Sequence, residues 1–335
     1  MDQKDEKEKK RQLPVWLLAV LDLLLTGAVL CVFAVFHHVI PHMRLVENGP
    51  PEPVGSVLNT SVPAPAYDEE TERRSWREKF SEYFSEEAEI TETSYSSPNL
   101  SVTITEHSSA EASPALTYFV ADIYIAGIEN FQTCFSQGSA DDPENIAMEN
   151  QAVLALNGDY CLNQSSGILV RNGELYMSGG TTCDICVLYQ DGRMVTYGPE
   201  EYREEEILAA EPYQIWKFGP ALLNSDGTPR EEYNTSSALL NSHPRSGLGY
   251  FEPGHYCFVV VDGRQGGYSD GIPMAGFAEI FSELGCVSAY NLDGGASSAM
   301  VFNGGTVNRP CNGGRYVSDM LIIKETEITE GEKGK

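Results

Sequence analysis

Basic side chains are scarce in this sequence. Its 335 residues include 22 Lys and Arg against 49 Asp and Glu, which gives a formal net charge of −27. Because the phosphates of a nucleic acid would be repelled by such a chain, we exclude a nucleic-acid partner. The length allows one large domain or two modest ones, with enough residues for a full hydrophobic core.

Histidine is also scarce, and the catalytic templates that depend on it are missing. No His follows His255, so the segment "GASSA" cannot complete the Ser…Asp…His order of an α/β-hydrolase. The sequence has neither an HExxH zinc motif nor a P-loop. His107, His243 and His255 lie far apart along the chain, and we interpret them as surface or packed residues and not as metal ligands.

The cysteine spacing gives no clear metal site. Cys183 and Cys186 have CxxC spacing without a second CxxC. This disfavours zinc and leaves either a local disulfide or two buried thiols. No EF-hand spacing occurs either. We therefore predict no cofactor and no metal site; the alternative left open is a calcium ion held by the Asp- and Asn-containing turns.

One long apolar run occupies residues 13–40. About 20 apolar residues span a bilayer, so the run predicts a transmembrane helix, with Asp22 inside it at an energetic cost. The alternative is a cleaved signal peptide, whose apolar region is usually shorter. Basic residues precede the run, and the positive-inside rule then places residues 1–12 in the cytoplasm and the rest outside. We expect a single-pass protein of the cell membrane.

Residues 41–98 have the composition of a stalk. The Pro-rich, polar stretch "ENGPPEPVGSVLNTSVPAPAYDEE" predicts an extended linker. The following stretch, "TERRSWREKFSEYFSEEAEI", predicts an aromatic helix that docks on the domain, on a partner or on the membrane surface, or that remains a marginal helix in the linker. The folded domain is expected at 99–325, followed by a charged tail at 326–335.

From about residue 99 the sequence becomes typical of strands. Val, Ile, Thr and aromatic residues alternate with polar ones in the runs at 100–107, 116–125, 152–160, 167–176, 184–198 and 257–264. Asn-Gly and Asp-Gly pairs predict hairpin turns between several of them. "MAGFAEIFSELG" predicts a helix that ends at Gly285, and 142–151 predicts a second one. We expect an α+β domain with a strand-rich mixed sheet and a few helices.

Polar residues collect where the apolar runs end. In "NLDGGASSAM", Asp293 follows a predicted strand and is itself followed by two glycines. Glycine permits unusual backbone dihedrals and a close approach to a ligand, and N–H groups exposed at such turns bind anionic oxygens. An ordinary hairpin turn explains any single case, but five clusters share the pattern. Carboxylates, arginines and amides together suit a glycosyl bond beside an anionic group.

Four segments of the sequence resemble successive blocks of the phosphodiester glycosidase domain. In chain order they are "LALNGDY", "HPRSGLG", "VVVDGRQGGYSDGIPMAGFAEIF" and "GCVSAYNLDGGASSAMVFNGGTVNRP…GGRYVSDML". The resemblance implies hydrolysis of a sugar-1-phosphate diester, which releases the sugar and leaves a phosphomonoester. The chain departs from many family members after "NG", where Asp159, Tyr160 and Cys161 replace an aromatic residue or Gly.

The implied reaction needs cations at the phosphate and a carboxylate at the anomeric carbon. Arg245, Arg264 and Arg315 match the cations, and we assign Arg245 to catalysis. Asp293 and Asp159 are the candidate nucleophile or base, although a turn-capping role for Asp293 is the alternative. The other predicted site residues are the ligand-binding Asn157, Gly158, Asn291, Gly294, Gly295 and Ser297, and Asp262 and Asp319, which would orient Arg264 and Arg315.

We therefore expect a membrane-anchored hydrolase outside the cytoplasm that cleaves glycosyl-phosphate links of a cell-surface glycan or exopolysaccharide. Its partners would be the glycosyl-phosphate or polysaccharide substrate and the membrane. Two alternatives remain: a glycan-binding module that holds a polysaccharide without cleaving it, and a structural envelope protein recruited through the aromatic segment 76–84.

Overall fold

The computed structural model describes residues 53, 55–56, 76–109, 114–136, 140–161 and 166–326. The predicted membrane span at 13–40 and nearly all of the predicted tail lie outside these residues. No helix within the described ranges is long and apolar enough to cross a bilayer.

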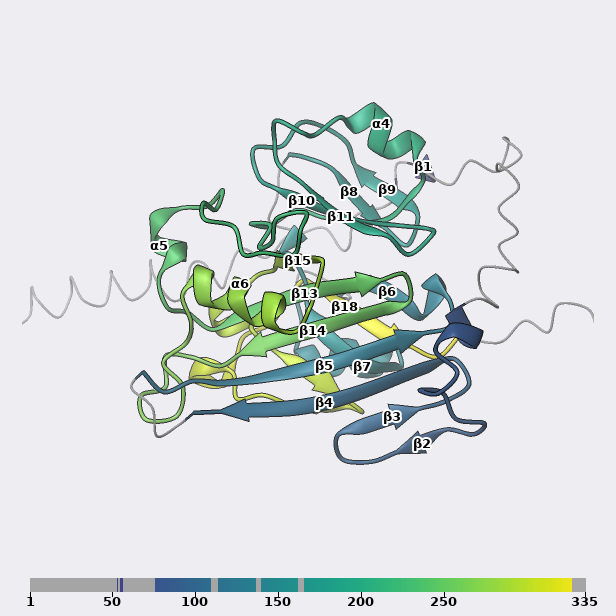
Figure 1. Cartoon of the computed structure of the whole chain (residues 1–335), viewed down its shortest axis with the longest axis vertical. Helices are drawn as coiled ribbons and strands as arrows, with labels where there is room; N and C mark the ends of the chain where they lie inside the picture. Colours follow the sequence, from purple (N-terminus) through teal and green to yellow (C-terminus); the bar gives the residue numbers. More distant parts are fainter. Residues whose placement is uncertain are drawn as a thin grey trace, which may run out of the picture. The chain divides into compact units, whose positions relative to one another are not determined.

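Three sheets build the described part of the chain (Figure 1). The seven-stranded sheet has the order β15-β13-β14-β5-β4-β3-β2, the five-stranded sheet β17-β16-β7-β18-β6, and the six-stranded sheet β1-β9-β8-β12-β10-β11. Together with the helices they confirm the α+β class. The prediction of a mixed sheet is wrong, because every pairing between the described strands is antiparallel. Hairpins, which join antiparallel strands, connect many of them directly.

The elements have the following bounds. The seven-stranded sheet contains β2 (Glu89–Ile90), β3 (Ser94–Ser96), β4 (Leu100–Ser108), β5 (Thr117–Ile125), β13 (Arg245–Glu252), β14 (His255–Val261) and β15 (Ser288–Asn291). The five-stranded sheet contains β6 (Phe131–Phe135), β7 (Ala152–Asn157), β16 (Met300–Phe302), β17 (Gly305–Thr306) and β18 (Asp319–Lys324). The six-stranded sheet contains β1 (Gly55–Ser56), β8 (Leu169–Arg171), β9 (Glu174–Met177), β10 (Ile185–Tyr189), β11 (Met194–Tyr197) and β12 (Pro212–Trp216).

The helices are short. They include α3 (Pro143–Glu149), α4 (Glu204–Ala209), α5 (Ser237–Leu240) and α6 (Met274–Glu283), with single 3₁₀ turns at η3 (Ile128–Asn130), η5 (Gly295–Ser297) and η6 (Cys311–Gly313). The helices predicted at 142–151 and at 274–285 are confirmed as α3 and α6. Asp142 caps α3 by accepting the N–H of Glu144, and Pro143 begins the helix, where its missing N–H costs nothing.

The seven-stranded and five-stranded sheets share one hydrophobic core. Successive side chains of a strand face opposite sides of the sheet. In β14, Phe258 therefore faces the core that also contains Leu156 of β7, whereas its neighbour Val259 packs in the cluster that contains Phe277 of α6. A separate cluster packs α3 against the other face of the five-stranded sheet. The two sheets are thus each covered by a helix on the side away from their common core.

The aromatic segment 76–84 packs on the domain, which is one of the alternatives predicted for it. Trp76 and Phe80 are buried in the main hydrophobic cluster. A Cβ on Gly192 would lie 2.5 Å from the Trp76 ring, so the ring fills the space that a side chain would need there. Strands β2 and β3, which lie within the range predicted as stalk, extend the seven-stranded sheet beyond β4. These residues belong to the same folded unit as β4.

The cysteines of the described residues form no disulfide. Cys186 is buried in β10, and burial raises the pKa of its thiol well above the ordinary value. Cys183 is partly exposed. Both cysteines of the CxxC pair are thus free thiols, as one interpretation predicted, but only Cys186 is buried.

The polar strand ends meet at one edge of the two packed sheets. Arg245 begins β13 directly opposite Val261, which ends β14. In the five-stranded sheet, Asn157 ends β7. Its side-chain Nδ2 donates to the carbonyl oxygen of Asp293, just after β15, at 2.7 Å. This hydrogen bond joins the two sheets at the edge where the predicted site residues collect.

Candidate active site

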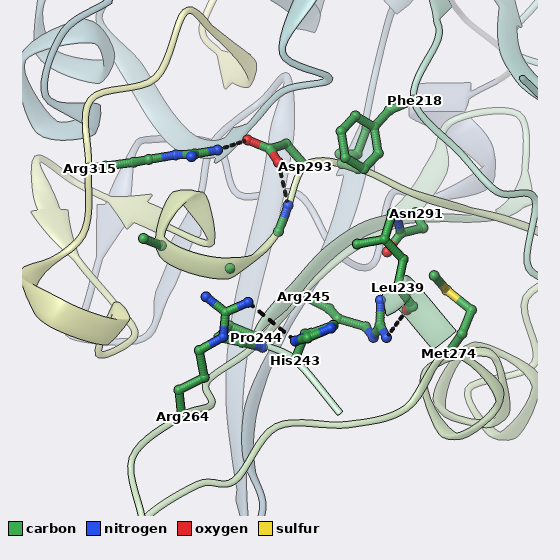
Figure 2. A pocket seen from close by; sticks show the side chains of 14 residues that line it. Phe218, Leu239, His243, Pro244, Arg245, Arg264, Met274, Asn291, Asp293 and Arg315 are labelled. Carbon is green, nitrogen blue, oxygen red and sulfur yellow. Dashed lines mark hydrogen bonds and ion pairs between the residues drawn. The ribbon is translucent and has the colours of Figure 1, made fainter. Parts of the chain in front are cut away.

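A cavity of about 220 Å³ lies at this edge (Figure 2). Its lining includes the predicted site residues Arg245, Arg264, Asn291, Asp293, Gly294, Gly295 and Arg315. The remaining lining residues, which the sequence did not single out as ligand contacts, are Phe218, Leu239, His243, Pro244, Met274, Leu292 and Ala296. The fold therefore brings together residues from positions 218 to 315.

Asp293 is held through both of its carboxylate oxygens. Oδ1 accepts the backbone N–H of Gly294 at 2.9 Å, and Oδ2 forms an ion pair with Nη2 of Arg315 at 2.7 Å. The side chain of Asp293 is 14% exposed, so it keeps contact with the cavity. The turn-capping role and the cavity-facing role, predicted as alternatives, are both present.

The two glycines that follow Asp293 are required by close contacts. A Cβ on Gly294 would lie 2.8 Å from the carbonyl oxygen of Pro244. Gly295 has φ +68, and a Cβ there would lie 3.3 Å from Nη1 of Arg264. A side chain at either position would displace the loop or the guanidinium. The glycines thus leave room for Arg264 beside the Asp293 turn.

Arg315 is fixed by three different contacts. Besides its ion pair with Asp293, its Nε donates to Oγ of Ser297 at 2.5 Å. Its guanidinium carbon lies 5.5 Å from the centre of the Tyr160 ring, within the range of a cation–π contact. Ser297, predicted to bind a ligand, is buried and positions Arg315 instead.

Arg245 is buried and bound by neutral groups alone. Its Nε donates to the carbonyl oxygen of Ile272 at 2.8 Å, and Nη2 donates to those of Leu239 and Asn241 at 2.7 Å each. Burial lowers the pKa of Arg245 to about 10, so the guanidinium still carries its charge at neutral pH. Within the described ranges no carboxylate forms an ion pair with Arg245.

Arg264 is the third cation of the cavity, and its side chain is exposed. Its Nη2 lies 3.2 Å from Nδ1 of His243 (Figure 2). None of the ion pairs among the described residues involves Arg264. Among the residues that the structure describes, two of the three arginines of the cavity therefore have no carboxylate partner.

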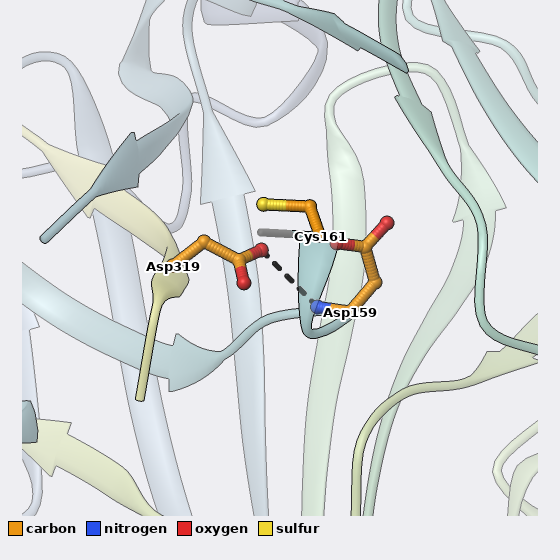
Figure 3. Close-up of side chains that lie close together, drawn as sticks. All are labelled: Asp159, Cys161 and Asp319. Atoms are coloured by element: carbon orange, nitrogen blue, oxygen red, sulfur yellow. Dashed lines mark hydrogen bonds between the residues drawn. The ribbon is translucent and has the colours of Figure 1, made fainter. Parts of the chain in front are cut away.

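Asp159, the second predicted catalytic carboxylate, lies outside the cavity lining in a buried cluster (Figure 3). Its Oδ1 accepts Nη2 of Arg171 at 2.6 Å, and its Oδ2 accepts the N–H of Lys217 at 2.6 Å. Asp319 joins the cluster at 3.6 Å from Arg171 and accepts the N–H of Asp159 at 3.1 Å. Asp159, Arg171 and Asp319 form what we call the buried ion cluster.

The buried ion cluster contains one cation and two carboxylates. Burial and the neighbouring Asp159 raise the pKa of Asp319 to about 7, because a second ionised carboxylate is disfavoured in this buried position. A Cβ on Gly158 would lie 1.9 Å from Oδ2 of Asp319. Gly158, predicted to bind a ligand, is required instead by its contact with this carboxylate.

The buried ion cluster does not suit a metal ion. Asp159, Cys161 and Asp319 each place one potential ligand atom within 4.8 Å of the others. However, Arg171 already supplies the positive charge beside both carboxylates. Burial also raises the pKa of the Cys161 thiol well above the ordinary value, and a protonated thiol is a poor ligand.

Asp262 and Asp319 do not orient the arginines that we predicted as their partners. Asp262 accepts hydrogen bonds from Nδ2 of Asn308, the N–H of Arg309 and the hydroxyl of Tyr268. Burial raises its pKa. Arg264 lies two residues after Asp262, and its backbone is in the left-handed region with φ +59. Its guanidinium contacts His243 and not Asp262.

The two predicted asparagines differ in their placement. Asn157 is fully buried, and its Oδ1 accepts Oγ of Ser246 at 2.6 Å and the N–H of Ala299 at 3.2 Å. It therefore positions the Asp293 turn and does not line the cavity. Asn291 does line the cavity, where its Nδ2 donates to the carbonyl oxygen of Gly219 at 2.7 Å.

The profile of a family described as "Phosphodiester glycosidase" matches residues 150–324. This range covers more than half of the chain and contains every residue that lines the cavity. The chain belongs to the phosphodiester glycosidase family.

The chain is also similar to one curated protein and to one solved structure. The SPbeta prophage-derived uncharacterized protein YomE of Bacillus subtilis is 32% identical over 187 residues, which make up 53% of this chain and 29% of YomE. The chain thus spans less than a third of that relative. The catalytic domain of zebrafish N-acetylglucosamine-1-phosphodiester alpha-N-acetylglucosaminidase, auto-inhibited by its pro-peptide, is 20% identical with a TM-score of 0.57, over 72% of this chain and 88% of that domain. This second likeness shows a shared fold.

Proposed function

We propose that the protein hydrolyses a glycosyl-1-phosphate diester, releasing the free sugar and leaving a phosphomonoester. The observation that carries this proposal is the charge of the cavity, where Arg245, Arg264 and Arg315 surround a single carboxylate, Asp293. The chain as a whole has a net charge of −27, so this local excess of cations is opposite in sign to the charge of the chain. Membership of the phosphodiester glycosidase family supports the same class of reaction.

The bond that breaks joins the anomeric carbon to a phosphate oxygen. As it breaks, positive charge develops on the sugar ring and negative charge on the departing phosphate. Asp293 is the carboxylate of the cavity lining, and we assign it to the anomeric carbon, either as nucleophile or as the base for the attacking water. An inverting or a retaining outcome distinguishes these two roles.

The arginines stabilise the departing phosphate. Arg315 is neutralised by its ion pair with Asp293, whereas among the described residues no carboxylate forms an ion pair with Arg245 or Arg264. We therefore assign Arg245 and Arg264 to the phosphate oxygens, where fixed cations stabilise the growing charge. The phosphate leaves with both electrons of the broken bond and needs no proton, so no general acid is required.

We further propose that residues 13–40 anchor the protein in the cell membrane, with its domain outside the cytoplasm. The length of the apolar run and the basic residues before it support this orientation. A cell-surface glycan or an exopolysaccharide with glycosyl-phosphate links is then the substrate class within reach. Protease treatment of intact cells checks the orientation, because a domain outside is degraded and a domain inside is protected.

The reaction is tested with a nitrophenyl diester of N-acetylglucosamine 1-phosphate in ¹⁸O-labelled water, using the full chain. We expect ¹⁸O in the released sugar, together with nitrophenyl phosphate. Asp293→Asn should abolish this release, and Asp226→Asn, the same change at an exposed turn, should preserve it. Sugar 1-phosphate and nitrophenol as products would contradict the proposal. Binding without turnover across a panel of sugars would favour the glycan-binding module.

A further inference from the structure

We propose that His243 is a positioning residue of the active site: as a neutral imidazole that carries its proton on Nε2, it holds the Arg264 guanidinium in the orientation that receives the phosphate. This proposal rests on the proposed function for the identity of the anion, but its geometry does not. His243 was interpreted from the sequence as a surface or packed histidine, and the structure places it in the cavity lining.

The two ring nitrogens of His243 face partners of opposite kinds. Nε2 lies 2.9 Å from the carbonyl oxygen of Ala238, and Nδ1 lies 3.2 Å from Nη2 of Arg264. A carbonyl oxygen only accepts hydrogen bonds, and a guanidinium only donates them. Nε2 must therefore carry the proton, and the lone pair of Nδ1 must accept from Arg264. The other neutral tautomer would break both bonds, and an imidazolium would set two donors against each other.

The imidazole is held at its backbone as well as at Nε2. The N–H of His243 donates to the carbonyl oxygen of Ile272 at 3.2 Å. In return, the N–H of Ile272 donates to the carbonyl oxygen of His243 at 3.1 Å. Pro244 follows directly, and its ring restricts the backbone of the residue before it. Nδ1 is thus an acceptor with a fixed direction.

Arg264 depends on this acceptor. Within the described ranges, the guanidinium of Arg264 makes one hydrogen bond, and its partner is His243. Its backbone is in the left-handed region at φ +59, and its Nη1 lies 3.3 Å from the position of a Cβ on Gly295. An exposed Arg side chain is otherwise free to sample many rotamers. His243 and Gly295 together select one of them.

A neutral acceptor serves an anion site better than a carboxylate would. In the same cavity, Asp293 pairs with Arg315 and cancels its charge. Imidazole fixes the direction of Arg264 without cancelling its charge, which stays available to a phosphate. The same arrangement occurs at Arg245, whose partners are three carbonyl oxygens. One of these oxygens belongs to Leu239, and the neighbouring Ala238 accepts from His243. The α5 helix therefore holds Arg245 directly and Arg264 through His243.

The tautomer is tested first, because it does not depend on activity. A long-range ¹H–¹⁵N spectrum of the full chain reports the protonation of each ring nitrogen, and the His243→Asn variant assigns the signal. We expect an unprotonated Nδ1 and a protonated Nε2 at neutral pH. A protonated Nδ1, in either the other tautomer or the imidazolium, would overturn the proposal.

The positioning role is tested by a double-mutant cycle. His243→Leu should raise the KM for the diester about tenfold with a smaller change in kcat, as expected for losing one hydrogen bond to a charged group. His243→Asn, which keeps an acceptor near the place of Nδ1, should recover part of this loss. In an Arg264→Gln background, His243→Leu should have no further effect, and additive losses would contradict the proposal. His107→Leu, at a histidine stacked on Tyr118 outside the cavity, is the control.

Affinity for inorganic phosphate separates this proposal from the proposed function. The wild type, His243→Leu, Arg264→Gln and the double variant should show the same non-additive pattern in their affinity for phosphate. Calorimetry measures these affinities, and the pattern is expected even if no diester is cleaved. If the diester is cleaved but the phosphate affinities are additive, the proposed function stands and the positioning role of His243 fails. If His243→Leu does not fold, the His243→Asn variant and the spectrum of the wild type still decide.

Discussion

Two buried arginines of this protein differ in what surrounds their charge. Arg171 lies between Asp159 and Asp319, and Arg245 lies among carbonyl oxygens. Both are nearly excluded from solvent, and burying a guanidinium without a carboxylate is costly. A cation balanced inside the protein stabilises the fold, whereas one left unbalanced beside a cavity is suited to an external anion. The comparison separates structural from ligand-binding charges by their partners, and the following variants test it.

The largest effect is expected from Arg171→Met. The change removes the guanidinium that lies between the buried carboxylates of Asp159 and Asp319, which should lower the free energy of unfolding by about 3–5 kcal/mol. Urea unfolding measures the change. Arg193→Met is the matched control, because its ion pair with Asp191 is exposed and should be worth less than about 1 kcal/mol. Equal losses of unfolding free energy in the two variants would contradict a structural role for the buried ion cluster.

Arg315→Gln should act on catalysis more than on stability. The change removes the ion pair that orients Asp293 and one cation of the cavity, so we expect kcat/KM to fall about 100-fold. Arg309→Gln, at a cation that packs over Tyr268 outside the cavity lining, should retain kcat/KM within about twofold. A similar loss in both variants would mean that overall charge, and not the position of Arg315, supports the reaction.

Asp319→Asn should change how stability depends on pH. Burial and Asp159 raise the folded-state pKa of Asp319 to about 7, above the ordinary carboxyl value of about 3.9. The proton therefore stabilises the folded state fully below about pH 4, and this contribution is lost as the pH rises through about 7. Asn cannot ionise, so the variant should gain about 1 kcal/mol or more relative to the wild type between pH 5 and pH 8. Parallel stability profiles from urea unfolding would contradict the shifted pKa.

Gly295→Ala gives the smallest expected effect. With a Cβ present, the φ of +68 should lower the free energy of unfolding by about 1 kcal/mol. The same Cβ would lie 3.3 Å from Nη1 of Arg264, so it should displace the guanidinium and raise KM a few-fold. Gly304→Ala has a similar φ of +82 but open space around the Cβ. Both variants should therefore lose similar stability in thermal unfolding, while only Gly295→Ala changes KM. Unchanged KM in both would show that Arg264 tolerates displacement.

Much of the fold was predictable because its signals are local. Alternating runs gave β4, β5 and β14, and helical spacing gave α6. Asn172 and Gly173, an Asn-Gly pair inside the predicted run 167–176, form the turn between β8 and β9, and both residues have positive φ. The pairings of β14 with β5 and of β18 with β7, and the docking of Trp76, depend on contacts between distant segments, which no local pattern specifies.

The site was predictable in composition but not in its pairing. The strand-end pattern collected Arg245, Arg264, Asp293 and Arg315, which the structure places around one cavity. The sequence could not show that Arg171 would neutralise Asp159, although a lone Arg inside an apolar strand was an available signal. Likewise, His243 stands directly before Pro244 and Arg245 in "HPR", but its role depends on the partner at each ring nitrogen.

The most direct test compares Asp293→Asn with Asp159→Asn, the same change at the two carboxylates that the sequence proposed for catalysis. Activity on the glycosyl-phosphate diester and thermal unfolding are measured on both. We expect Asp293→Asn to lower kcat about 1,000-fold with little change in Tm, and Asp159→Asn to lower Tm while its folded protein keeps its activity. A stable, inactive Asp159→Asn beside an active Asp293→Asn would contradict the assignment of the active site to the cavity.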